Sequence, residues 1–249
     1  MDMRYPALLF LFTAACSIPG HTASKVVEFS VPAGTLQRLD CETHNGGITI
    51  TGSPTADSVT VRAEMSVRGY SQEEADANLH LLEVGNETVD GKLRLYGKFP
   101  RAELSNRSPS FAFTMTIPTR LEVTLLSHNG DLHVTDLAGA LKSTTHNGDI
   151  GLKGQSPKVA LETHNGSVVA DFAGTGSLDG DVTTHNGNVT LGFPGAVDAT
   201  VTASTHNGSL SGGAKLADAK VSRRQLTGRI GAGTGKLTIT THNGNVTVR

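Results

Sequence analysis

The chain has 249 residues, a formal net charge of −2 at pH 7, 29 glycines and no tryptophan. This near-neutral charge excludes a protein that binds nucleic acid or anionic membranes through bulk electrostatics. A chain of this length can bury a core, but with only 4% aromatic residues the core must be built from small and aliphatic side chains.

The amino-terminal residues have the features of an export signal. An apolar run from Ala7 to Ala15 is too short to cross a bilayer as a helix but long enough for the core of a signal peptide. The small residues directly before Cys16 resemble the lipobox of bacterial lipoproteins, in which the signal is cut before a cysteine that carries a diacylglycerol. We predict a signal peptide over 1–15, lipidation of Cys16 and a tether over 16–24. The following Ser17 favours the outer membrane; an ordinary cleavage site would instead give a periplasmic or secreted protein.

A four-residue motif, Thr-His-Asn-Gly or Ser-His-Asn-Gly, recurs along the chain. Copies begin at 43, 127, 145, 163, 184, 205 and 241, and QLTGRIGAG at 225–233 is predicted to be a degenerate eighth copy. Repetition every 18 to 21 residues over most of this region is typical of repeat folds. The first copy stands 84 residues before the second, so the section between them is predicted to be different in structure.

That section, residues 47–126, is predicted to cap one end of the repeat array. SQEEADANLHLLEVG, at 71–85, begins with a Ser-x-x-Glu capping box, places apolar residues on one helical face and ends at Gly85. One short helix is therefore expected. The other expected elements are a hairpin over 88–96 around its Asp-Gly turn, and strands over 111–117 and 121–126.

Within each repeat, apolar and polar residues alternate with a period of two, which predicts strands with one buried face. Five residues before the glycine stand small or aliphatic residues, among them Cys41, which we interpret as a core residue without a disulfide partner. Each copy is thus two short strands joined at Asn-Gly, with the glycine at a positive φ. The residues two positions after the glycine are apolar in all eight copies: Ile48, Leu132, Ile150, Val168, Val189, Leu210, Ile230 and Val246.

The predicted fold class is all-β, a parallel β-solenoid of about eight rungs with one short helix in the amino-terminal capping region. Stacking of rungs about 4.8 Å apart places identical residues over one another and explains why every column is repeated. The alternative, an antiparallel β-meander or sandwich, does not require that identity. We predict one domain over 25–249, with regular repeats over 127–249 and an uncovered end near 247–249 that could dock another chain. The predicted structural ladder consists of Asn45, Asn129, Asn147, Asn165, Asn186, Asn207 and Asn243.

Three segments resemble a known family. They are the pattern L-x-T-x-N-G-D-I-x-L, as in LKSTTHNGDIGL, the Ser-x-Glu-Glu-Ala segment at 71–75, and FTMTIPTRLEVTL before the closely spaced repeats. They resemble the putative-adhesin domain of bacterial β-strand repeats, a domain of unknown function in exported envelope proteins. The resemblance covers about residues 25–249. It implies a β-solenoid-like fold and an extracytoplasmic location, and it supplies no catalytic residues.

By alternation, the threonine of each motif points inward and the histidine outward, so the histidines should form an exposed ladder. Imidazoles that stack for packing reasons alone are one interpretation. The other is weak binding of zinc, copper or nickel, because a spacing of about 4.8 Å exceeds the roughly 3.3 Å between two nitrogens on one tetrahedral zinc. No other cofactor is predicted. The candidate metal ligands are His128, Asp131, His133, His146, Asp149 and His164.

An enzyme is the remaining alternative. Asp131 and Asp149, one rung apart, could approach the separation of about 5 Å in a retaining glycosidase, as in polysaccharide-active β-helix enzymes. The same column continues as serine and asparagine, however, and no Ser-His-Asp, P-loop or Cys-x-x-Cys pattern is present. We predict a non-enzymatic exported envelope protein, adhesin-like or scaffolding, that presents a repetitive His/Asn/Thr face to an envelope protein or surface ligand.

Overall fold

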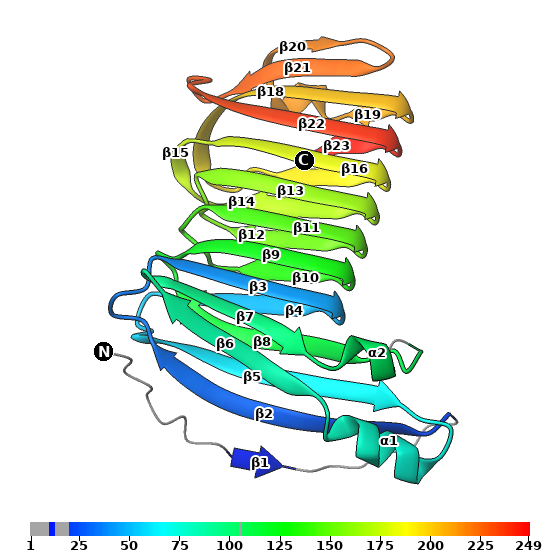
Figure 1. Cartoon of the computed structure of the whole chain (residues 1–249). Helices are drawn as coiled ribbons and strands as arrows, with labels where there is room; N and C mark the ends of the chain where they lie inside the picture. The colour runs from blue at the N-terminus through cyan, green and yellow to red at the C-terminus, as the bar shows by residue number, and fades with distance from the viewer. Residues whose placement is uncertain (1–9, 13–19, 105) are drawn as a thin grey trace.

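The computed structural model of the chain describes residues 10–12, 20–104 and 106–249. Cys16 and most of the predicted signal peptide lie outside the described residues. The described chain is almost entirely β-structure and forms an elongated stack of strands (Figure 1). Within this part of the chain, no helix is long and apolar enough to cross a membrane.

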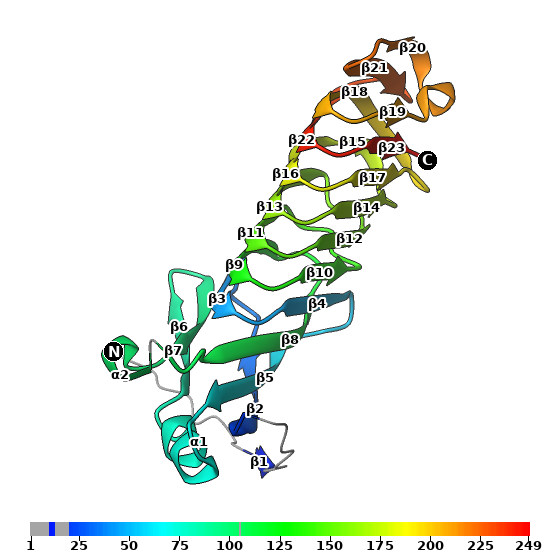
Figure 2. The ribbon, with the colours of Figure 1, turned by 90° about the vertical axis from the view of Figure 1, so that its right-hand side faces the viewer.

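Seven rungs make up most of the molecule, and each consists of one strand in each of two long sheets (Figure 2). We call the sheet that contains β4 the short-strand sheet and the one that contains β3 the ladder sheet. The two strands of a rung meet at the Asn-Gly corner. In spatial order, the rungs are β3 (Arg38–Asn45) with β4 (Ile48–Ser53), β9 (Glu122–Asn129) with β10 (Leu132–Thr135), β11 (Leu141–Asn147) with β12 (Ile150–Gly154), β13 (Lys158–Asn165) with β14 (Val168–Phe172), β16 (Asp179–Asn186) with β17 (Val189–Gly192), β22 (Gly235–Asn243) with β23 (Val246–Val248), and β18 (Ala196–Asn207) with β19 (Leu210–Ser211).

Neighbouring rungs pair in parallel and in register, so the asparagine of one motif lies beside the asparagine of the next. This arrangement confirms the parallel β-solenoid and excludes the antiparallel meander. The alternation is also as predicted, because the motif threonine or serine is buried in every rung and the histidine is exposed. Aliphatic columns from the two sheets fill the space between them, and the few fully buried aromatics are Phe111, Phe113 and Phe172.

The order of the rungs departs from the order of the sequence. The last rung in the chain, β22–β23, lies between β16–β17 and β18–β19, and β23 pairs with a strand on each side. Figure 1 accordingly places the carboxyl terminus within the stack rather than at its tip. The prediction of an uncovered end near 247–249 is therefore wrong. Because the same residue types recur at equivalent positions in every rung, the last rung of the chain can insert between two earlier rungs and still match the side chains of both.

The degenerate copy at 225–233 does not form an eighth rung. Its residues belong to a hairpin of β20 (Ala217–Val221) and β21 (Gln225–Ile230), and β21 pairs antiparallel with β18 at the tip of the stack. Leu226 and Thr227 stand where a rung has its histidine and asparagine, so the side chain that would continue the asparagine ladder is missing. Two small elements complete this region, β15 (Thr175–Ser177) and the 3₁₀ turn Gly213–Lys215.

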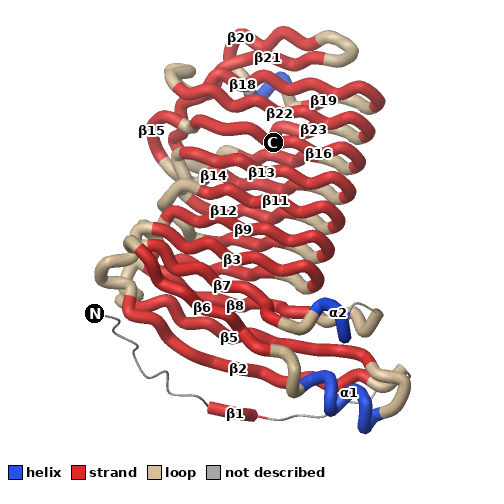
Figure 3. Tube along the Cα trace, in the orientation of Figure 1, coloured by secondary structure: helices blue, strands red, loops and turns tan. Residues whose placement is uncertain are grey.

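Longer strands extend both sheets at the amino-terminal end of the stack. The short-strand sheet continues from β4 to one parallel neighbour, and the strands beyond that neighbour are antiparallel to one another. The ladder sheet continues from β3 to a hairpin whose nearer strand is parallel to β3. The tube in Figure 3 shows these strands and the two helices at one end of the molecule. The added elements are β8 (Ser110–Pro118), β5 (Ser58–Arg68), β2 (Thr22–Pro32) and β1 (Phe10–Phe12) in one sheet, β7 (Lys92–Lys98) and β6 (Glu83–Val89) in the other, and the helices α1 (Gln72–Leu79) and α2 (Arg101–Leu104).

The helix α1 is shorter than predicted. It begins at the expected cap, where the Ser71 hydroxyl accepts a hydrogen bond from the Glu74 amide at 3.1 Å. It ends at Leu79 rather than at Gly85, because the residues from Glu83 onward pair with β7. Gly85 has a different use there: a Cβ at this position would overlap the ring of Tyr96 on the paired strand.

Candidate functional site

The seven motif asparagines lie one above another at the corner of each rung. Each carboxamide nitrogen donates to the carboxamide oxygen of a neighbouring asparagine at 2.7 to 2.9 Å, and Asn45 ends the series by donating to the Pro109 carbonyl at 3.1 Å. In six of the motifs the buried threonine or serine donates to the backbone carbonyl of an adjacent corner glycine, as Thr163 does to Gly148 at 2.8 Å, and Thr43 donates to the Phe111 carbonyl on the neighbouring strand. These bonds hold successive rungs in register.

The corner glycines are required mainly by crowding. The positive φ predicted for every corner occurs only at Gly46 (119°) and Gly148 (159°) among the described corner glycines. At each corner, however, a Cβ would overlap a backbone carbonyl oxygen of the adjacent strand; Gly166, for example, would overlap the oxygen of Gly148. Any side chain here would force the rungs apart.

The position after the corner glycine also serves the stack. Asp131 accepts a hydrogen bond from the backbone amide of Asp149 at 2.8 Å, and Asp149 accepts one from the amide of Ser167 at 2.7 Å. Serine and asparagine side chains continue the same pattern in later rungs. The two aspartates considered as a glycosidase pair are thus engaged with the backbone.

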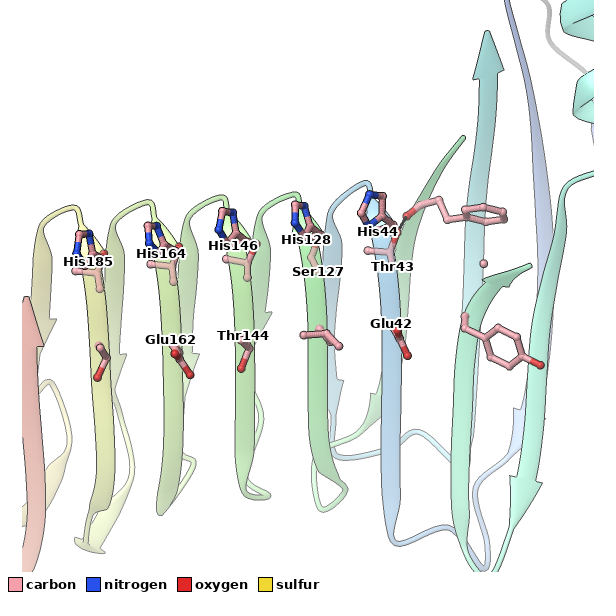
Figure 4. Close-up of a pocket in the computed structure, with 18 of the residues that line it drawn as sticks. Glu42, Thr43, His44, Ser127, His128, Thr144, His146, Glu162, His164 and His185 are labelled. Atoms are coloured by element: carbon pink, nitrogen blue, oxygen red, sulfur yellow. Dashed lines mark hydrogen bonds between the residues drawn. The ribbon is translucent and has the colours of Figure 1, made fainter. Parts of the chain in front are cut away.

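The motif histidines form a continuous ladder on the outward face of the ladder sheet (Figure 4). Adjacent imidazole centroids are 4.7 to 4.9 Å apart, with interplanar angles between 7° and 28°. Within the described chain, the imidazoles are held by this stacking and receive or donate no side-chain hydrogen bond. In spatial order the histidine ladder consists of His44, His128, His146, His164, His185, His242 and His206.

The sequence-predicted metal ligands do not gather at one point. His128, His146 and His164 belong to the histidine ladder, whereas His133 lies beyond the corner on the other sheet. Both predicted aspartate ligands bond to backbone amides at the corner. In the described ranges, no group of three or more His, Cys, Asp or Glu side chains is arranged to hold a metal ion.

A groove of about 810 Å³ runs beside the histidine ladder. Six of the seven ladder histidines line it, together with the outward residues two positions earlier in each strand, which include Glu42, Leu126, Thr144, Glu162 and Thr183. Figure 4 shows the imidazoles on one side of the groove, with Glu42, Thr144 and Glu162 in a row below them.

The amino-terminal end of the groove is lined by residues outside the repeats. Arg94 and Tyr96 come from β7, Phe99 comes from the segment between β7 and α2, and Arg101 is the first residue of α2. The Arg94 guanidinium lies 4.9 Å from the centre of the Tyr96 ring and 3.4 Å from the Glu42 carboxylate. Sequence analysis missed these residues because nothing in a non-repeating hairpin shows which face it will present.

Cys41 is a buried core residue, as predicted. Burial raises the pKa of its thiol far above the usual range. The thiol therefore stays protonated and is not a nucleophile.

The fold and the groove define a parallel β-solenoid with an exposed histidine ladder. The family model described as Toastrack DUF4097 matches residues 10–249, and the chain belongs to this family. No curated protein matches the chain.

Several solved structures are similar. A putative cell adhesion protein from Clostridium sporogenes has 11% identity and a TM-score of 0.46, covering 90% of this chain and 98% of its own. A putative adhesin from Bacteroides fragilis has 14% identity and a TM-score of 0.36, with coverage of 90% and 97%. A putative lipid binding protein from Parabacteroides distasonis has 11% identity and a TM-score of 0.35, with coverage of 93% and 98%. At these values, the likeness does not extend to function.

Proposed function

We propose that the chain is a non-enzymatic, exported envelope protein, adhesin-like or scaffolding, and that the groove beside the histidine ladder is its binding site. One observation carries this proposal. The asparagine, threonine and glycine of each motif are committed to hydrogen bonds and close packing between rungs, whereas the histidines stack only on one another and face solvent along a groove. A side chain repeated in every rung without a bonding role in the stack is available for a ligand.

The chemistry of the corner supports binding rather than catalysis. Hydrolysis by a carboxylate pair needs one group free to act as acid or nucleophile. Asp131 and Asp149 each accept a backbone hydrogen bond from the next rung, and the column continues as Ser167. Asp131 and Asp149 therefore have a structural role, because each belongs to a column of side chains that bond one rung to the next.

Blocking the groove tests the binding face. Thr183 lines the groove and is exposed, and Thr49 is exposed on the outward face of the opposite sheet. We would prepare Thr183→Cys and Thr49→Cys separately and attach a maleimide-linked polyethylene glycol to each; the buried Cys41 does not compete for the reagent. Labelled Thr183→Cys should lose binding to isolated envelope fragments, and labelled Thr49→Cys should keep it. Equal binding by both would contradict the proposal.

Export and anchoring rest on the amino-terminal sequence. We propose that the chain is cleaved before Cys16 and anchored by lipid at that residue, because small residues precede the cysteine and an apolar run precedes them. Membrane fractionation of cells that express the full chain or Cys16→Ser tests this step. The full chain should be in the membrane fraction and Cys16→Ser in a soluble extracytoplasmic fraction. An unchanged distribution would contradict lipid anchoring.

Divalent-metal binding is a second candidate function, favoured by the unbroken stack of imidazoles. Neutral imidazole is a ligand for zinc, copper and nickel, but nearly parallel rings 4.8 Å apart at His146 and His164 must tilt to share one ion. We expect weak sites of this kind. Calorimetric titration of the protein and of its His128→Gln/His146→Gln/His164→Gln variant decides the question: binding abolished in the variant supports the sites, and binding unchanged in the variant rejects them.

A further inference from the structure

The fixed charges that line the groove cancel. Its acids are Glu42 and Glu162, and its permanent bases are Arg94 and Arg101. The other ionisable residues of its lining are Tyr96, which donates its hydroxyl to Glu87 at 2.7 Å, and six ladder histidines. The net charge of the groove lining therefore depends on whether its imidazoles are protonated.

Histidine is the side chain whose charge ordinarily changes between about pH 5 and 8. When the ladder imidazoles are neutral, the groove is close to neutral. When they are protonated, they form a positive row with a spacing of 4.7 to 4.9 Å. An anion that binds only the protonated row must bind more tightly as the pH falls. The imidazoles of the protein must then take up protons when the anion binds.

The surface next to this groove does not oppose an anion. A second groove on the outward face of the same sheet is lined by the acids Glu122, Asp179 and Asp181. Its bases outnumber them by one and are Arg38, Lys142, Lys158 and Lys236. An extended ligand that reaches from the first groove into the second therefore meets a small excess of fixed positive charge there.

The neutral part of the lining indicates which polyanion fits. Between the imidazoles and the second groove stand the hydroxyls of Thr144, Thr183 and Thr240, with the carboxylate of Glu162 in the same row. Hydroxyls donate and accept hydrogen bonds, and the Glu162 carboxylate accepts them from hydroxyl groups. A polymer that carries both carboxylates and hydroxyls satisfies both rows. A polyphosphate lacks the hydroxyl groups and would meet the two groove carboxylates.

We propose that the groove binds a linear acidic polysaccharide along the histidine ladder, and that protonation of the ladder switches this binding on. This inference rests on the proposed function in using the same face, and it adds the class of ligand and the pH dependence. The carboxylates of the polymer pair with the imidazolium groups, and its hydroxyls bond to the threonine and glutamate row.

The test measures binding of polygalacturonate to the protein produced from the full-length gene and processed by the cell, at pH 5 and at pH 8. Binding should be about tenfold or more tighter at pH 5, and it should weaken as salt is raised. Neutral dextran should bind at neither pH. The His128→Gln/His146→Gln/His164→Gln variant, which removes three of the six groove histidines, should lose most of the gain at pH 5. The His133→Gln variant, which removes an exposed histidine outside the groove, should keep the whole gain.

Equal affinity at the two pH values, a pH 5 gain that is undiminished in the triple variant, or equal binding of dextran would each overturn this inference. Thermal unfolding of every variant at both pH values identifies a loss that comes from unfolding. The groove-blocking experiment distinguishes the two proposals: if labelled Thr183→Cys loses envelope binding while polygalacturonate does not bind, the binding face stands and the acidic polysaccharide is rejected.

Discussion

The asparagine ladder and the histidine ladder come from adjacent residues of one motif, yet they differ in almost every physical respect. Asn147 and its neighbours bond through their carboxamides at 2.7 and 2.8 Å, in the corner where rungs meet. His146 stacks on its neighbours at 4.9 and 4.8 Å and faces solvent. Equal repetition thus has two causes. One ladder ties the rungs together, and the other is carried on the surface that they build.

Removing the last rung breaks both ladders at once. Truncation after Thr234 deletes β22 and β23, which lie between two other rungs in both sheets. The β18–β19 rung then loses its parallel partner, and long strand edges are left unpaired. We expect that β18 to β21, which lie beyond the deleted rung in the stack, show no cooperative unfolding transition when urea denaturation is followed by circular dichroism. A truncated protein with one transition at the original midpoint would show that the rung order is different.

Filling a corner should have the next largest effect. Gly166→Ala places a Cβ against the carbonyl oxygen of Gly148, and only a backbone shift can relieve the overlap. We expect a loss of about 3 kcal/mol in the free energy of unfolding. Gly34→Ala is the matched control, because its Cβ would meet nothing within 4 Å. If both variants unfold at the same urea concentration, crowding at the corner is not what selects glycine.

Interrupting the asparagine ladder should cost less. Asn147→Ala removes one bond donated to Asn129 and one accepted from Asn165. Each neighbour keeps its other contacts, so we expect a loss of about 1 to 3 kcal/mol in the free energy of unfolding. Asn86→Ala, at an exposed strand position outside the ladder, should change it by less than about 0.5 kcal/mol. Similar urea midpoints for the two variants would remove the distinction between ladder and surface asparagines.

The sequence was sufficient to predict the rung and its two faces, because period-two alternation and in-register repetition appear directly in the columns. It was not sufficient for the order of the rungs. Identical columns allow any rung to pair with any other, so nothing in the motif at 241 indicates that it lies beside the motif at 184. The copy at 225–233 illustrates the opposite error: Ile230 follows the apolar column of a repeat, but Leu226 and Thr227 replace the ladder histidine and asparagine, and the strand pairs antiparallel.

The histidine ladder could be predicted in the same way, but the groove could not. Its amino-terminal end is lined by Tyr96 and Phe99, which come from β7 and from the segment after it, and neither segment belongs to a repeat. The role of Asp131 and Asp149 was also hidden, since a bond between a side chain and the backbone of the next rung appears only once the rungs are stacked.

The central claim, that the histidine ladder is carried by the stack without supporting it, is tested most directly by urea unfolding of the His128→Gln/His146→Gln/His164→Gln variant at pH 8, where imidazole is ordinarily neutral. Exposed substitutions each usually change stability by no more than about 0.5 kcal/mol, so we predict a free energy of unfolding within about 1.5 kcal/mol of the unmodified protein. A loss of several kcal/mol, greater than that for Asn147→Ala, would show that the imidazoles hold the rungs together and would contradict this account.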